Sequence, residues 1–332
     1  MGSRGSYKDD SAEAQGRKAY RSTPQAPRVT RKQNGPGRAQ ATTTEPAVDR
    51  FRRTDPYRAR REWLRYEGTA QRDLFRQLRE RFLVRHASPS GWVIDVGSGP
   101  GRFLPLIGGA GTRRVALDVA REMLRFIPGA WTAVEGGDPS PDRVLGDAIR
   151  APFAPRSFAE VALLGNTLGF AEERAPRLLE VAESLVRPDG RLLVEIAPAF
   201  GERSNYLYRL PERAAARLLR APVPAVLARV DREGFRAEPP RRSLPGSFRR
   251  FTVPELSQRW RDWGWEVEEV VAVAPALGLD PRRVAMVHPD EKAWNHLLEI
   301  EEGTGRKPER WSGAASVLLS VRRPLPPSDA YD

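Results

Sequence analysis

The chain has 332 residues, a formal net charge of +12 and no cysteine. The lack of cysteine excludes disulfides, cysteine-bound iron–sulfur clusters, cysteine-ligated zinc and thiolate nucleophiles, and it fits a cytoplasmic location. No apolar run approaches the ~20 residues that a membrane-spanning helix needs, so we expect no membrane partner.

The positive charge is concentrated at the N-terminus. The first 90 residues contain 21 Lys or Arg and 10 Asp or Glu, so they carry +11 of the net charge, and the rest of the chain is nearly neutral. Residues 1–48 are poor in apolar side chains, which predicts a disordered basic leader. Such a leader is compatible with nucleic-acid binding, but a solvated extension is the simpler interpretation.

Residues 49–90 form the second predicted unit. Apolar side chains recur at helical spacing over residues 57–85, and Gly68 interrupts them, which predicts helices on either side of this glycine. A larger α/β domain is predicted at residues 91–323, and the family resemblance given below implies that these helices cover it.

A glycine-rich turn follows the first strand predicted in that domain. The run from Val93 to Leu104 reads VIDVGSGPGRFL, which predicts a strand, a turn and the start of a helix near residue 103. Glycine allows the backbone to approach a ligand closely, and the N–H groups of such a turn and of a helix N-terminus can face a ligand. The binding candidates in this turn are Asp95, Gly97, Ser98, Gly99 and Gly101.

Further candidates follow the ends of the next three predicted strands. The carboxyl ends of parallel strands meet at one edge of a sheet, so we expect these residues to surround the same site as the glycine turn. A carboxylate at the tip of the second strand can accept hydrogen bonds from both hydroxyls of a ribose. Asp118 is such a carboxylate, and Val119 follows it. The further candidates Asp147, Ala148 and Asn166 are those that the family resemblance given below implies.

Apolar periodicity and turn residues predict the remaining elements. They are a helix over 172–187, a turn at 187–190, a strand over 191–196, a helix over 254–263, and strands over about 266–274 and 315–321. Residues 198–250 and 280–311 are predicted insertions, and residues 324–332 are a C-terminal tail. The first insertion is rich in arginine, which fits a solvated surface segment. The alternative, a lid over a bound molecule, is implied by the family resemblance given next.

The order of these motifs resembles that of the class I S-adenosylmethionine-dependent methyltransferases. The spacing from Asp95 to Gly101, D-x-G-x-G-x-G, is that of their first motif and is one residue shorter than the dinucleotide fingerprint G-x-G-x-x-G. The segments 146–148 and 151–161 resemble later motifs of the family. Glu160 departs from the pattern, because it lies one position after the usual aspartate.

The resemblance implies a Rossmann-like, doubly wound, seven-stranded and mostly parallel sheet with helices on both faces, an N-terminal helical cover and two insertions. It implies S-adenosylmethionine as cofactor and S-adenosylhomocysteine as product. Asp95 and the glycine turn would lie beside the methionine part, Asp118 at the ribose, Asp147 and Ala148 at the adenine, and Asn166 near the transferred methyl group. Tyr66 or Arg72 would reach the methionine carboxylate, although packing and solvation are the simpler roles for these two side chains.

The function that the resemblance implies is in-line methyl transfer to an O, N or C atom of a small-molecule acceptor. In-line transfer needs little acid–base help, so no catalytic residue is assigned, and no metal site is predicted around His288, His296 and Glu299. The alternatives are an RNA methyltransferase that uses the basic leader, an NAD(P)-dependent oxidoreductase and a non-catalytic cofactor-binding protein. The turn at 166–169 lacks the proline pair typical of enzymes that methylate exocyclic base amines. The oligomeric state stays open.

Overall fold

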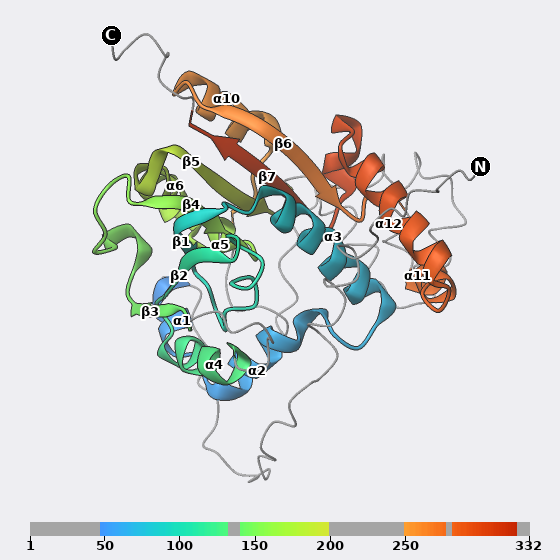
Figure 1. Ribbon diagram of the computed structural model, residues 1–332, viewed down its shortest axis with the longest axis horizontal. Helices are drawn as coiled ribbons and strands as arrows, with labels where there is room; N and C mark the ends of the chain where they lie inside the picture. The colour runs from blue at the N-terminus through green and yellow to red at the C-terminus, as the bar shows by residue number, and fades with distance from the viewer. Residues whose placement is uncertain (1–46, 132–139, 199–248, 277–280, 324–332) are drawn as a thin grey trace, which may run out of the picture.

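The computed structural model describes residues 47–131, 140–198, 249–276 and 281–323 (Figure 1). The predicted leader up to residue 46, nearly all of the insertion at 198–250 and the C-terminal tail lie outside the described residues. The helical cover begins at Ala47, inside the last two residues of the predicted leader, because helix α1 spans Ala47–Arg52. None of the helices in the described ranges is long and apolar enough to cross a membrane.

A single seven-stranded sheet organises the described chain, with the strand order β3-β2-β1-β4-β5-β7-β6. Strand β7 is antiparallel to its two neighbours, and the other pairs are parallel, so the predicted doubly wound, mostly parallel sheet is confirmed. The strands are β1 (Ser90–Val96), β2 (Gly111–Asp118), β3 (Asp142–Leu145), β4 (Phe158–Leu163), β5 (Val186–Ile196), β6 (Glu266–Val273) and β7 (Ser316–Arg322). The order reverses between β1 and β4, which creates a crevice at the carboxyl ends of these strands.

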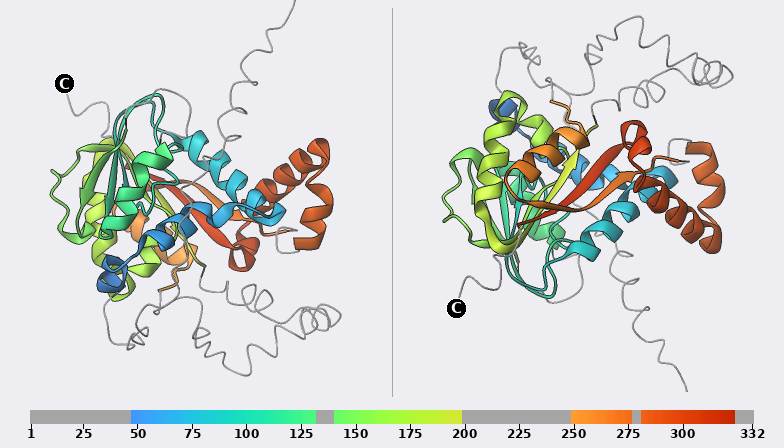
Figure 2. Two further views of the ribbon diagram at one scale, coloured as in Figure 1. Left: turned by 90° about the horizontal axis from the view of Figure 1, so that it is seen from below. Right: turned by 90° about the horizontal axis from the view of Figure 1, so that it is seen from above.

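Helices cover both faces of the sheet (Figure 2). Alternate residues of the central strands enter two different cores: Ile94 and Val161 pack with α6 and α10, whereas Val93 and Ala162 pack with α3, α4, α11 and α12. This double burial explains why β4 is apolar along nearly its whole length. The helices are α2 (Pro56–Trp63), α3 (Ala70–His86), α4 (Arg121–Trp131), α5 (Thr167–Phe170), α6 (Ala175–Leu185), α10 (Val253–Asp262), α11 (Pro281–Val287) and α12 (Glu291–Gly305).

The helix predicted near residue 103 is wrong, because the segment after the glycine turn forms consecutive turns. Leu104 and Leu106 donate their N–H groups three residues back, and only Ile107 makes an α-type bond, to the Phe103 carbonyl. Pro105 has no N–H to donate, and Gly108 has a φ of 67°. A helix therefore cannot propagate through this segment.

The turn predicted at 187–190 and the strand predicted from residue 191 also need correction. Strand β5 starts at Val186, which pairs with Phe158, and the register shifts before Arg191 pairs with Glu160. Residues 187–190 are therefore an irregularity inside the strand. The helix predicted over 172–187 is split into a 3₁₀ turn at Glu172–Arg174 and helix α6.

The helical cover is fixed to the sheet by a buried ion pair. Helix α3 begins at the N-cap Thr69, after Gly68, whose φ is 86°. On this helix Arg79 binds Glu195 of β5, with Nη2 and Oε1 2.6 Å apart, and both side chains are buried. Burial alone would raise the pKa of Glu195, but the charge and hydrogen bonds of Arg79 outweigh it and lower the pKa.

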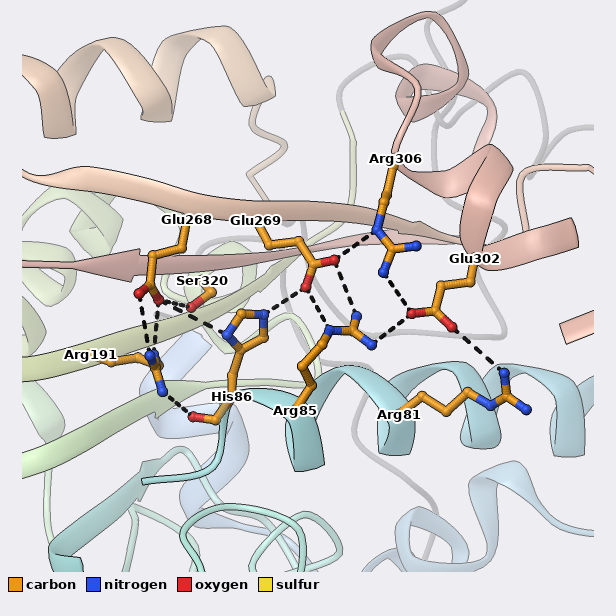
Figure 3. Close-up of polar contacts among 9 residues, drawn as sticks. All are labelled: Arg81, Arg85, His86, Arg191, Glu268, Glu269, Glu302, Arg306 and Ser320. Carbon is orange, nitrogen blue, oxygen red and sulfur yellow. Dashed lines mark hydrogen bonds and ion pairs between the residues drawn. The ribbon is translucent and has the colours of Figure 1, made fainter. Parts of the chain in front are cut away.

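A second polar network attaches the end of α3 to β6 and α12 (Figure 3). The register shifts between Val267 and Glu269, and this bulge directs both Glu268 and Glu269 toward α3. Glu269 accepts hydrogen bonds from His86 at 2.7 Å, Arg85 at 3.0 Å and Arg306 at 2.9 Å. Burial would raise the pKa of Glu269, but these three donors lower it to about 2. Glu268 binds Arg191 and Ser320 in the same way.

Glu160 is a buried carboxylate with fewer hydrogen-bond donors around it than Glu195 or Glu269. Its Oε2 accepts the Ser88 N–H at 2.8 Å, and its Oε1 has no hydrogen-bond partner in the described ranges. Burial raises its pKa from 4.5 to about 7, although the Ser88 N–H and the charge of Arg191 oppose the shift. The ionised side chain is therefore unfavourable in the folded protein.

We predict that Glu160→Gln stabilises the protein above about pH 7 and that this gain disappears toward about pH 4.5. The wild type loses stability as the pH rises through this window, because its folded state holds the proton more tightly than the unfolded chain, whereas glutamine does not titrate. Urea unfolding at both ends of the window measures the difference, with the exposed Glu299→Gln as control. A gain that is the same at both ends would contradict the prediction.

Candidate functional site

The crevice between β1 and β4 opens into a cavity of about 670 Å³. The glycine turn, the ends of β2, β3 and β4, and the helical cover line it, and the volume lies within the range of small-molecule sites. Helix α2 of the cover packs beside α4 (Figure 1), and the cover contributes Phe51, Arg58, Glu62 and Arg65 to the cavity lining. Of the ten predicted site residues, seven line this cavity: Gly97, Ser98, Gly99, Asp118, Val119, Asp147 and Ala148.

The N–H groups of the glycine turn are bound within the protein. Gly97 and Ser98 donate to the Leu117 carbonyl at 2.7 and 3.1 Å, and Gly99 donates to the Asp118 carboxylate at 2.8 Å. The expectation that these N–H groups face a ligand is therefore wrong. Because no α-helix follows the turn, the site also lacks the helix N-terminus that commonly binds a pyrophosphate.

The three glycines of the turn have different physical roles, although all have positive φ. A Cβ at Gly97 would lie 2.5 Å from the Thr167 side chain, and one at Gly101 would lie 2.8 Å from Leu104. These two glycines permit close packing. A Cβ at Gly99, where φ is 55°, would meet no atom within 4 Å. Gly99 therefore presents bare backbone to the cavity.

Asp118 lies at the tip of β2 and connects the turn to the cavity. Its two carboxylate oxygens accept the N–H groups of Gly99 at 2.8 Å and Ala120 at 2.7 Å, and each oxygen keeps a further acceptor position. Burial raises the pKa of Asp118, and the backbone hydrogen bonds oppose the shift. The carboxylate is thus held in one orientation at the cavity wall.

Asp147 and Ala148 follow β3 at another part of the wall. Asp147 caps a 3₁₀ turn (Ala148–Arg150) by accepting the Ile149 N–H at 3.2 Å, and its second oxygen binds Arg174 at 2.5 Å. Ala148, Ile149 and Leu178 of α6 supply an apolar surface next to these polar groups. This part of the cavity suits a flat ring with polar edges.

Three predicted residues lie outside the cavity lining. Gly101 packs against Leu104, as described above. Asn166 has left-handed backbone geometry between the lining residues Gly165 and Thr167, and its side-chain oxygen has no hydrogen-bond partner within the described segments. Asp95 is only 1% exposed.

The burial of the Asp95 carboxylate is only partly compensated by other groups. Neither of its oxygens has a hydrogen-bond partner among the residues that the structure describes. Burial raises its pKa to about 7; the charge of Asp118 adds to the shift, and Arg102 opposes it. Buried carboxylate oxygens without partners are unusual and often mark functional positions.

Tyr66 and Arg72 do not line the cavity. The guanidinium groups of Arg79 and Arg102 each lie over the Tyr66 ring, at 4.7 and 4.3 Å from its centroid. Arg72 donates to the Glu67 carbonyl. The alternative that Tyr66 is a packing residue agrees with this geometry.

Sequence reasoning missed the side chains that the cover contributes. Phe51, Arg58, Glu62 and Arg65 line the cavity, and Arg102 enters it directly after the glycine turn. Arg102 donates to the Glu62 carbonyl at 2.5 Å, and its guanidinium also lies over Phe103. Only Arg102 had a sequence signal, its position beside Gly101.

His288 and His296 do not line the cavity. His288 contacts Asp73 at 3.0 Å, and His296 pairs with Glu299 at 3.6 Å on an exposed helix face. Within the described ranges, no group of three or more His, Cys, Asp or Glu side chains could hold a metal ion.

The strand order and the cavity at the strand reversal define a Rossmann-like, doubly wound domain. Residues 94–194, from β1 to β5, match the family model described as "Methyltransferase domain". This segment of the chain is therefore similar to the methyltransferase family, in agreement with the resemblance drawn from the sequence motifs.

One curated relative is the biotin biosynthesis bifunctional protein BioHC of Cellvibrio japonicus (strain Ueda107), which is 30% identical over 126 residues. The match covers 35% of this chain and 23% of that protein, so the chain spans about a quarter of the relative's length.

Solved structures with similar backbones include two methyltransferases. One is from Thermotoga maritima, described as a possible histamine N-methyltransferase, with 18% identity, a TM-score of 0.48 and coverage of 84% of this chain and 98% of that chain. The other is magnesium protoporphyrin IX methyltransferase from Synechocystis PCC 6803 with bound S-adenosylhomocysteine, with 15% identity, a TM-score of 0.47 and coverage of 83% and 97%.

We predict that Gly99→Ala preserves the fold but lowers the affinity for S-adenosylhomocysteine by about tenfold or more, because the added Cβ projects into the cavity. Gly264→Ala is the matched control, since Gly264 also has positive φ (72°) and open surroundings but lies outside the cavity. Each variant should lose about 1–2 kcal/mol of stability through backbone strain. Calorimetric titration and thermal melts measure both effects, and equal affinities of the two variants would contradict the prediction.

Proposed function

We propose that the protein transfers the methyl group of S-adenosylmethionine to a small-molecule acceptor. The observation that carries the proposal is the combination, in one cavity, of an oriented Asp118 carboxylate and a glycine turn whose N–H groups are bound internally. A pyrophosphate would need those N–H groups, whereas a ligand made of adenine, ribose and an amino acid does not.

The lining residues fit the parts of this cofactor. Asp118 has acceptor positions for two ribose hydroxyls, and Val119 follows it along the wall. Asp147 and Ala148 would contact the adenine, where the cavity combines polar and apolar surface. Gly97, Ser98 and the bare backbone of Gly99 would lie along the methionine part.

The charged ends of the methionine part also have candidate partners. Arg102, whose Nε has no hydrogen-bond partner in the described chain, would bind the carboxylate. Asp95 lies close enough to Arg102 and Asp118 for their charges to affect its pKa, and it would supply negative charge toward the amino group. Asn166 remains a proposed contact near the transferred methyl group.

When bound, S-adenosylmethionine supplies an electrophilic methyl group with a neutral thioether as leaving group. The chain's own contribution is to orient the two reactants and to exclude water. Phe51, Phe103, Met123 and Phe170 give the cavity apolar walls for this purpose. We assign no general base, and proton transfer is needed only for an acceptor that must first be deprotonated.

The structure gives little support to the alternatives. An NAD(P)-dependent oxidoreductase would lack its phosphate-binding N–H groups. An RNA methyltransferase needs an open surface for a polymer, whereas helices of the cover line this cavity. A non-catalytic binding protein would bind S-adenosylmethionine without consuming it.

We predict that Asp118→Asn weakens S-adenosylhomocysteine binding about 100-fold, because charge-assisted hydrogen bonds to two hydroxyls contribute about 1.5–3 kcal/mol each. Isothermal titration measures the change, and 2′-deoxy-S-adenosylhomocysteine isolates the ribose contact, since the wild type should discriminate against it more than the variant does. Asp142→Asn, an exposed change on β3, is the control. Binding of NAD without binding of S-adenosylhomocysteine would refute the proposed function.

A further inference from the structure

The side of the cavity that the cover forms carries an excess of positive charge. Arg58 and Arg65 of the cover and Arg102 line it, and Glu62 is the one carboxylate that the described part of the cover contributes. The remaining carboxylates of the cavity lining, Asp118, Asp147, Glu172 and Glu173, come from the sheet domain. Glu62 forms an ion pair with Arg65. In the part of the chain that the structure describes, no carboxylate forms an ion pair with Arg58 or Arg102. Two guanidinium groups therefore face the cavity without a paired anion.

Arg58 is held in place although its charge is not neutralised. Its guanidinium lies 5.1 Å from the centroid of the Phe51 ring, and Phe51 in turn contacts Phe170 edge-on at 5.3 Å. Its Nε is buried and has no hydrogen-bond partner among the described residues. Burial lowers the pKa of Arg58; the nearby charge of Glu62, and to a smaller extent that of Asp55, opposes the shift, whereas Arg61 and Arg65 add to it. An anion bound here would remove an unfavourable interaction.

The proposed cofactor supplies an anion for only one of the two guanidinium groups. Its methionine part has a single carboxylate, and Arg102, directly beside the glycine turn, is the residue placed for it. Arg58 belongs to a different element, α2, and lies beside the aromatic pair formed by Phe51 and Phe170. With the cofactor bound, Arg58 would still face the cavity without an anion.

We propose that Arg58 binds a carboxylate of the acceptor, so that the methylated substrate is an organic acid with an apolar body. This inference rests on the proposed function, because it takes the remainder of the cavity as the acceptor site. A guanidinium binds the two oxygens of a carboxylate in parallel, and Phe51, Phe170 and Met123 supply apolar contacts for the body of the acid.

The test uses benzoate and its neutral isostere benzamide as probes. Full-length protein is first titrated with S-adenosylhomocysteine, and each probe is then titrated into the saturated complex. We expect benzoate to bind about tenfold or more tightly than benzamide to the wild type, and we expect this preference to disappear in Arg58→Gln. Arg60→Gln is the matched control, because Arg60 is an exposed arginine of the same helix that does not line the cavity.

The outcomes separate this inference from the proposed function. If S-adenosylhomocysteine does not bind the wild type, the proposed function fails and the inference fails with it. If it binds and the two probes then bind equally or not at all, only the inference is overturned. A fall in S-adenosylhomocysteine affinity in Arg58→Gln would also overturn it, because Arg58 would then contact the cofactor. Loss of the benzoate preference in Arg60→Gln as well would show that general surface charge is responsible.

Discussion

The site depends on the hydrogen bonds between the glycine turn and the end of β2. The N–H groups of Gly97 and Ser98 donate to the Leu117 carbonyl, and that of Gly99 donates to the Asp118 carboxylate. Buried backbone donors must be satisfied, and here the neighbouring strand satisfies them. The bonds hold Gly99 and Asp118 at a fixed separation on the wall of one cavity. They also leave the turn without free N–H donors for phosphate groups, so the turn is poorly suited to binding a pyrophosphate.

The helical cover is an integral part of this arrangement. Arg79 of α3 and the N–H of Gly165, which follows β4, both bind the Glu195 carboxylate. One buried anion thus connects the cover, β5 and the cavity wall. Removing one partner from a buried ion pair leaves an uncompensated charge and costs about 3–5 kcal/mol. The arginines that the cover brings to the cavity are therefore held by the same packing that stabilises the fold, so the proposed acceptor site depends on the attachment of the cover.

Local patterns in the sequence predicted the bounds of helices and strands well where apolar periodicity and turn residues alone set them. Strands β6 and β7 and helix α10 lie within one or two residues of their predicted bounds, because apolar periodicity and turn residues act over short distances. The helix expected near residue 103 fails because Pro105 and Gly108 outweigh a short apolar run. The bulge that brings Glu268 and Glu269 to the same side of β6 had no local signal, since it depends on pairing with β7.

The sequence by itself determined the type of sheet and the set of strand ends around the site, because parallel strands place their carboxyl ends at one edge whatever the details of packing. Only the tertiary structure decided which of those residues line the cavity. In the folded protein Asp95 is buried, and Gly101 packs against Leu104. The N–H groups of the glycine turn bond to the end of β2. The tertiary structure also brought Arg58 to the cavity from a helix that precedes the sheet in the chain. Contacts between such distant segments depend on how whole helices pack on the sheet, and no local pattern of residues encodes that packing.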